Sequence, residues 1–167
     1  MDRRVIALIA STALLAVVVV VVLAGRAGDD SEDSSSPELA TKPEVEVPEG
    51  PPPEELVSED LVTGEGAVAE AGSEVTVQYV LADYETGDEI ESSWESPDPF
   101  SFQLGAGMVI PGWDQGVEGM REGGRRQLVI PPDLAYGPQG QPPDIGRNAT
   151  LVFVIDLVSV GAQQPPG

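Results

Sequence analysis

The stretch VIPGWDQGVEGMREGG, residues 109–124, decides how the fold is interpreted, because it holds the one convincing short helix of the chain. Pro111 suits the first turn of a helix, and Asp114 complements the positive N-terminal end. Three apolar side chains recur at i, i+4 and i+7 and therefore share one face: Trp113, Val117 and Met120. The paired glycines at 123–124 are expected to end the helix.

Strands are predicted on both sides of this helix. Residues 75–81 alternate between apolar and polar with period two, which is typical of a half-buried strand. The turn Thr-Gly-Asp at 86–88 predicts a hairpin. Strands are expected at 75–81, 89–92, 100–104, 126–130 and 151–160. Many strands and one helix predict an α+β fold with the helix on one face of the sheet.

Composition limits the chemistry that the chain can perform. Its 167 residues include 29 Asp or Glu and 8 Lys or Arg, a net charge of −21, which argues against binding nucleic acid through a basic face. There is no histidine and no cysteine, which excludes His-based triads, thiol nucleophiles, thiolate or imidazole zinc sites and disulfides. The carboxylates show no metal-binding spacing, so neither a metal nor a cofactor is predicted.

Residues 5–24 form an apolar run that is long enough, at about 1.5 Å per residue, to cross a bilayer as a helix. Arg3 and Arg4 precede the run and acidic residues follow it, so the positive-inside bias predicts a single-pass cell-membrane anchor with the domain outside the cytoplasm. A cleaved signal followed by secretion is the alternative. Residues 23–26 resemble a lipoprotein cleavage box with Arg26 in place of the obligatory cysteine, which excludes lipid attachment.

Four segments follow from these patterns. Residues 1–25 are the anchor or signal, and 26–42 are an acidic, Ser-rich linker expected to be disordered. Residues 43–160 form the folded domain, and 161–167 are a disordered tail. Val45 and Val47 alternate in the Pro-rich start of the domain and are expected on an edge strand.

Aromatic residues are few, and six of the eight are spread over separate predicted elements: Tyr79, Phe100, Phe102, Trp113, Tyr136 and Phe153. Such residues can meet either as an ordinary core or as the walls of an apolar pocket. Tyr and Trp also carry a polar group that needs a partner when buried. Composition leaves both interpretations open.

Four linked motifs are spaced in an order that resembles one family. They are PFSF at 99–102, VIPGW at 109–113, LAYG at 134–137 and NATLVF at 148–153. Together they resemble the FKBP-type peptidyl-prolyl cis/trans isomerases over residues 56–160. The resemblance implies a twisted antiparallel sheet wrapped around one short helix.

The resemblance also implies a proline-binding site. It assigns substrate-facing catalytic roles to Tyr79, Glu91 and Tyr136, the last through a hydroxyl to the substrate carbonyl. It assigns the binding walls to Trp113 as the floor and to Phe100, Phe153, Val109, Ile110, Ile145 and Ile90. Ile90 stands where the family usually has an aromatic residue, Glu91 where it has aspartate, and Ser96 where it has a basic residue, so reduced activity is expected.

The resemblance thus predicts a monomeric peptidyl-prolyl isomerase that acts on proline-containing polypeptide clients and assists the folding of exported proteins. Macrolides are expected ligands of the same pocket, and the membrane is a partner through the N-terminal helix. Two alternatives from other classes are kept. One is a non-catalytic module or holdase that grips Pro-containing segments, and the other is a purely structural surface domain.

Overall fold

The computed structural model describes residues 37–163, which contain one α-helix and six strands. The elements in chain order are β1 (Val57–Val62), β2 (Ser73–Asp83), β3 (Glu89–Ser92), β4 (Phe100–Gln103), α1 (Pro111–Val117), β5 (Arg125–Ile130) and β6 (Leu151–Gln163). Short 3₁₀ helices lie at Pro37–Ala40, Ser93–Glu95, Pro132–Leu134 and Gly137–Gln139. The predicted α+β class is confirmed, with one short helix against an antiparallel sheet.

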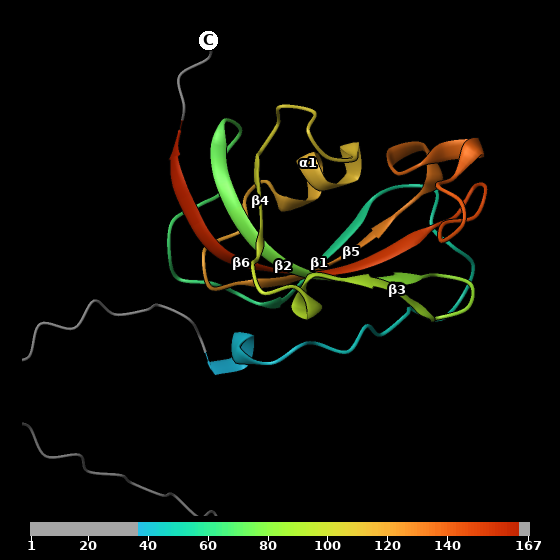
Figure 1. The fold of residues 1–167 in the computed structure, drawn as a ribbon, viewed down its shortest axis with the longest axis horizontal. Helices are drawn as coiled ribbons and strands as arrows, with labels where there is room; N and C mark the ends of the chain where they lie inside the picture. The colour runs from blue at the N-terminus through green and yellow to red at the C-terminus, as the bar shows by residue number, and fades with distance from the viewer. Residues whose placement is uncertain (1–36, 164–167) are drawn as a thin grey trace, which may run out of the picture. The chain divides into compact units, whose positions relative to one another are not determined.

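The strands form one antiparallel sheet in the order β1-β5-β6-β2-β3, with β4 also pairing to β2. Strands β2 and β6 are the longest and pair from Ser73 opposite Gln163 to Asp83 opposite Leu151. Figure 1 shows these two strands curving past α1, which lies on one side of the sheet. That side carries the main core, in which Trp113 and Val117 of α1 pack against Leu128 and other residues of the sheet.

Two glycines let α1 approach the sheet closely. A Cβ atom at Gly112 would collide with the Ile130 side chain, and one at Gly116 would collide with Leu128. The helix is shorter than the sequence predicted. It ends at Val117, and Met120, which was expected on its apolar face, follows it as a buried core residue. Glycine in the left-handed region follows the helix end, since Gly119 has φ of 82°.

Asp114 does more than complement the end of the helix. Its carboxylate accepts hydrogen bonds from the backbone N–H groups of Gly105 (2.8 Å) and Gly107 (3.1 Å). It therefore ties the loop between β4 and α1 to the first turn of the helix. This loop contains Met108, Val109 and Ile110, the residue directly before α1. The conformation of the loop therefore sets the position of their side chains.

The opposite face of the sheet is covered by an extended segment, residues 41–51. Val45 and Val47 pack there against a second small core of Tyr84, Val129 and Val152. The expected edge strand is not formed, because this segment lies across the face of the sheet and is held by side chains instead of a backbone ladder. Figure 1 shows it on the side of the sheet away from α1.

Secondary structure is present on both sides of the predicted domain, residues 43–160. Residues 37–40 form a 3₁₀ helix within the expected linker, and β6 continues to Gln163, beyond the expected end at residue 160. The predicted anchor at 5–24 and the end of the tail lie outside the described residues. Between residues 37 and 163, no helix is long and apolar enough to cross a membrane.

Candidate functional site

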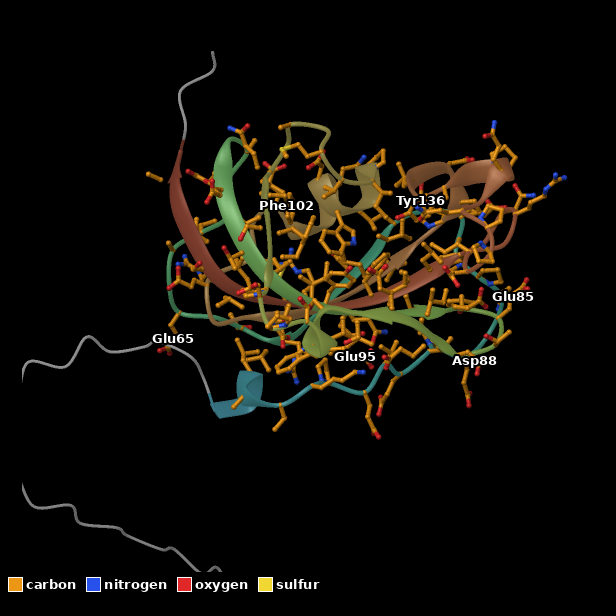
Figure 2. The ribbon with its side chains drawn as sticks, in the orientation of Figure 1. Glu65, Glu85, Asp88, Glu95, Phe102 and Tyr136 are labelled. Atoms are coloured by element: carbon orange, nitrogen blue, oxygen red, sulfur yellow. The ribbon has the colours of Figure 1, made fainter. Side chains whose placement is uncertain are left out.

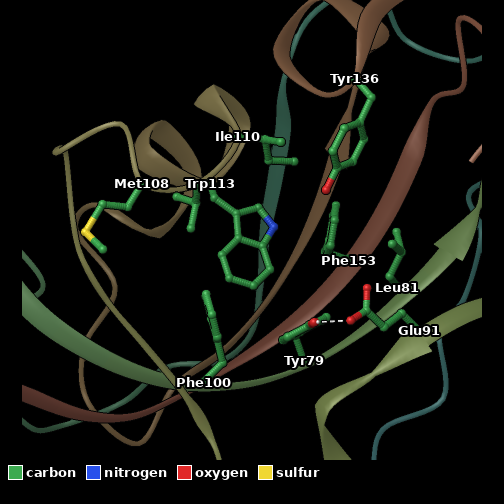
Figure 3. A pocket seen from close by; sticks show the side chains of 10 residues that line it. Tyr79, Leu81, Glu91, Phe100, Met108, Ile110, Trp113, Tyr136 and Phe153 are labelled. Atoms are coloured by element: carbon green, nitrogen blue, oxygen red, sulfur yellow. Dashed lines mark hydrogen bonds between the residues drawn. The ribbon is translucent and has the colours of Figure 1, made fainter. Parts of the chain in front are cut away.

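A cavity of about 410 Å³ lies between the curved sheet and α1. Figure 3 shows side chains from both layers converging on it. The sheet contributes residues from β2, β3, β4 and β6, and the other side is formed by α1, the loop before it and the loop after β5. The lining residues are Tyr79, Leu81, Glu91, Phe100, Met108, Val109, Ile110, Trp113, Tyr136 and Phe153.

Trp113 is a buried aromatic residue of the cavity, with 4% of its surface exposed. Its ring centroid lies 5.1 Å from that of Tyr79 and 5.3 Å from that of Phe153, both edge to face. Phe100 meets it at 6.0 Å, also nearly perpendicular. This geometry suits the opposed charges of ring face and ring edge, so the indole is held rigidly. The rings form both core and pocket wall, and the sequence had left these two interpretations open.

The indole nitrogen of Trp113 is buried and has no hydrogen-bond partner in the described part of the chain. Buried donors are nearly always paired, so an unpaired one on a cavity wall indicates a place for a ligand acceptor. Trp94 carries the other buried indole nitrogen without a partner among these residues, but its side chain does not line the cavity.

Tyr79 and Glu91 form the polar edge of the cavity. The Tyr79 hydroxyl donates to Glu91 Oε1 over 2.9 Å, the bond drawn in Figure 3. Burial raises the pKa of Tyr79 well above its ordinary value, and the hydrogen bond and charge of Glu91 raise it further. The proton therefore stays on this hydroxyl, which acts as a fixed donor.

Tyr136 faces the same cavity from the loop after β5, and its side chain is half-buried. Burial raises the pKa of its hydroxyl, and the nearby charge of Glu91 adds to the effect. Within residues 37–163 this hydroxyl makes no hydrogen bond. The backbone N–H of Ile110 likewise has no acceptor in that range, although its carbonyl accepts from the N–H of Trp113. Both groups are free to donate to a ligand.

Eight of the ten residues predicted for the site line the cavity, and two do not. Ile145 is a buried core residue, and its backbone pairs with Gln141 in an isolated bridge. Ile90 is half-buried and packs against the main core, outside the cavity lining. The position of Ile90 makes its departure from the aromatic type less consequential for the cavity than expected.

Two lining residues were not predicted. Leu81 lies two positions after Tyr79 on β2 and pairs with Phe153 across the ladder, so the period-two pattern already placed it on the cavity face. Met108 precedes Val109 in the loop before α1 and is 66% exposed. A large apolar residue in an exposed loop was the available signal for it.

The cavity thus offers apolar walls, three free donors and one carboxylate. The chain has no histidine or cysteine to attack a substrate, and no group of three or more acidic side chains in the described segment is arranged to hold a metal ion. Such a site can bind and orient a polypeptide segment and stabilise one of its conformations without forming a covalent bond.

Comparison with known proteins gives a consistent result. Residues 66–158 match the family described as FKBP-type peptidyl-prolyl cis-trans isomerase. The chain is 52% identical over 120 residues to an FK506-binding protein of Streptomyces anulatus, covering 71% of this chain and 97% of that relative. It is 53% identical over 119 residues to a probable FK506-binding protein of Corynebacterium glutamicum, covering 71% and 98%.

Two crystal structures are similar in fold. AtFKBP13 matches with a TM-score of 0.58 at 36% identity, covering 62% of this chain and 91% of that one. FkpA from Escherichia coli matches with a TM-score of 0.59 at 37% identity, covering 65% of this chain and 49% of that one. Residues 66–158, which match the family, include every residue that lines the cavity.

Proposed function

The chain belongs to the FKBP-type peptidyl-prolyl cis-trans isomerases, and from this premise we propose how its cavity accelerates the isomerisation of X-Pro bonds and which polypeptides are its substrates. The isomerase function rests on the family and on the aromatic cluster around Trp113. The roles of single residues, the ligands and the location of the protein are the proposal.

The reaction needs a surface that favours the twisted amide. An X-Pro bond rotates over a barrier of about 18–20 kcal/mol because the resonance of the amide is lost at the top. The twisted amide is less dipolar than the planar one, so a dry aromatic cavity favours it relative to water. No bond is made or broken, and no nucleophile is required.

Single roles follow from the geometry of the cavity. The enclosed indole of Trp113 is the floor on which the proline ring rests, and Phe100 and Phe153 are the walls. Tyr136 and the Ile110 N–H donate to carbonyl groups of the substrate, since neither has an acceptor among residues 37–163. Tyr79 and Glu91 fix the polar edge through their hydrogen bond.

The same cavity is proposed to bind FK506 and related macrolides, the ligand named for both bacterial relatives. Its volume of about 410 Å³ is in the range of small-molecule sites. A macrolide that fills the cavity would exclude the prolyl substrate.

The proposed location is the outer side of the cell membrane, with residues 5–24 as a single-pass anchor. Support comes from the length of the apolar run and from the basic residues before it. There the enzyme would assist the folding of exported proteins. The full-length protein is then expected in the membrane fraction after carbonate extraction, whereas a soluble form that begins near Gly25 would instead indicate a cleaved signal.

A second candidate is a holdase that grips Pro-containing segments without accelerating their isomerisation. It is favoured by the apolar rim of the cavity, where Phe100 is 41% exposed and Met108 is 66% exposed. Such a rim can hold an unfolded chain by contact alone.

One experiment separates the two candidates. The full chain in mild detergent is added to a proline-limited refolding reaction, with and without FK506. An isomerase accelerates the slow phase and loses this effect when FK506 is bound. If peptide and FK506 bind but the slow phase keeps its uncatalysed rate, the holdase candidate is correct.

A further inference from the structure

The rim of the cavity is chemically different on its two sides. Figure 3 shows Met108 and Phe100 on one side of Trp113 and Glu91 on the other. The first side is apolar and exposed. The other side ends in the exposed carboxylate of Glu91, which lines the cavity beside Tyr79. A polypeptide that crosses the cavity meets both.

The Glu91 carboxylate has no cationic partner among the described residues. Its one hydrogen bond there comes from the neutral Tyr79 hydroxyl, and this bond uses only Oε1. Its charge raises the pKa values of both Tyr79 and Tyr136, so the field of the carboxylate extends across the cavity.

The cations of this part of the chain are engaged elsewhere or stand alone. Lys42 pairs with Glu89 and Glu95, and Arg125 pairs with Asp156. Arg126 pairs with Asp60, and Arg121 donates to the Gly66 carbonyl. Arg147 has no ion pair with another described residue. None of them neutralises Glu91.

We propose that Glu91 is a specificity residue that selects X-Pro segments in which X, the residue before proline, is lysine or arginine. The substrate's own cation pairs with the free side of the carboxylate while the proline ring occupies the aromatic floor. This preference rests on the proposed isomerase function and names its substrate class.

The charge of the whole chain acts in the same direction. With 29 acidic and 8 basic residues, the protein attracts cationic segments before any contact is made. This long-range attraction cannot distinguish one proline from another, whereas Glu91 acts only at the bond in the cavity. The two effects are therefore separable by mutation.

The test compares three matched peptide substrates that differ only at the residue before proline, which is lysine, leucine or glutamate. The full chain in mild detergent is measured with each peptide in a protease-free isomerisation assay, and the dissociation constants are measured by calorimetry. An exposed ion pair supports a preference of up to about fivefold for lysine over leucine, which weakens with added salt.

Three variants locate the preference. Glu91→Gln keeps an acceptor for the Tyr79 hydroxyl but removes the charge, and should abolish the lysine preference. Glu91→Asp keeps the charge and should retain most of it. Glu85→Gln is the matched control, because Figure 2 shows Glu85 at the outer end of the β2–β3 hairpin and it does not line the cavity.

The outcomes are distinct. A lysine preference that disappears in Glu91→Gln and persists in Glu85→Gln supports the proposal. No preference in the wild type, or an equal preference in Glu91→Gln, overturns it. The leucine peptide reports the isomerase function separately: if it is not accelerated, that function fails, and the ratio of dissociation constants still decides the role of Glu91.

Discussion

The two faces of the sheet are covered in different ways and differ in how their polar groups are satisfied. On the far face, the Gln127 side chain donates to the Glu46 carbonyl, and Asp156 accepts two hydrogen bonds from Arg125. On the cavity face, the Trp113 nitrogen and the Tyr136 hydroxyl have no partner within residues 37–163. Because buried polar groups are normally paired, the comparison identifies the cavity face as the one built for a ligand.

The largest expected effect is the loss of Trp113. Trp113→Ala removes a buried ring from the cavity floor and should lower the free energy of unfolding by about 3–5 kcal/mol. Isomerase activity and FK506 affinity should be lost with it. Urea unfolding followed by fluorescence or circular dichroism measures the first effect.

Trp113→Leu separates folding from function at this position. The leucine side chain refills part of the core, so this variant should remain folded while its kcat/KM falls. If the folded leucine variant turns over like the wild type, catalysis lies elsewhere and the cavity interpretation is wrong.

The next effect concerns the contact between α1 and β5. Gly112→Ala places a methyl group against Ile130 and should destabilise the protein by about 1–3 kcal/mol, the usual penalty for overpacking a core. It should also displace the neighbouring Trp113 and reduce turnover. Gln115→Ala, an exposed position of the same helix, is the control and should leave both stability and rate nearly unchanged.

Changes on the far face should affect stability alone. Val45→Ala with Val47→Ala removes methyl groups from two half-buried side chains and should reduce the free energy of unfolding by about 1.5 kcal/mol. The kcat/KM for a prolyl peptide should stay the same, because no residue of this segment lines the cavity. A fall in rate without a fall in stability would show that the two faces are coupled.

The sequence predicted the cavity face better than the far face. Strand β2 and the helix were visible because their buried residues recur with a clear period, and Tyr79 and Trp113 follow from it. Strand β1 was missed because five of its six residues are exposed, so no alternation marks it. The segment 41–51 was assigned the wrong backbone role, since side-chain contacts across a sheet face leave no periodic signal.

The site residues show the same limit. The order of the motifs correctly predicted eight cavity residues. It could not indicate that Ile145, which forms a backbone bridge with Gln141, is buried in the core outside the cavity lining. Nor could it indicate Met108, whose place depends on the loop that Asp114 holds. Periodicity reports which side of an element a residue occupies, whereas loop geometry depends on contacts distant in sequence.

The smallest expected effect is that of pH on the rate. The chain has no histidine or cysteine, the side chains that ordinarily titrate nearest to neutral pH, and the pKa values of Tyr79 and Tyr136 are both raised. The rate should therefore be flat between about pH 6 and pH 9.

Each tyrosine keeps its proton in the folded state at a pH where the same tyrosine in the unfolded chain, with an ordinary pKa near 10, has lost it. Folding stability contributed by this difference is complete below that value and is lost as the pH rises beyond it. Tyrosinate absorbance measures the titration. Tyr79→Phe should remove a part of the absorbance increase that appears at high pH, and Tyr136→Phe should retain that part. A bell-shaped rate profile near neutral pH would mean that a titrating group takes part, against a mechanism in which the cavity only favours the twisted amide.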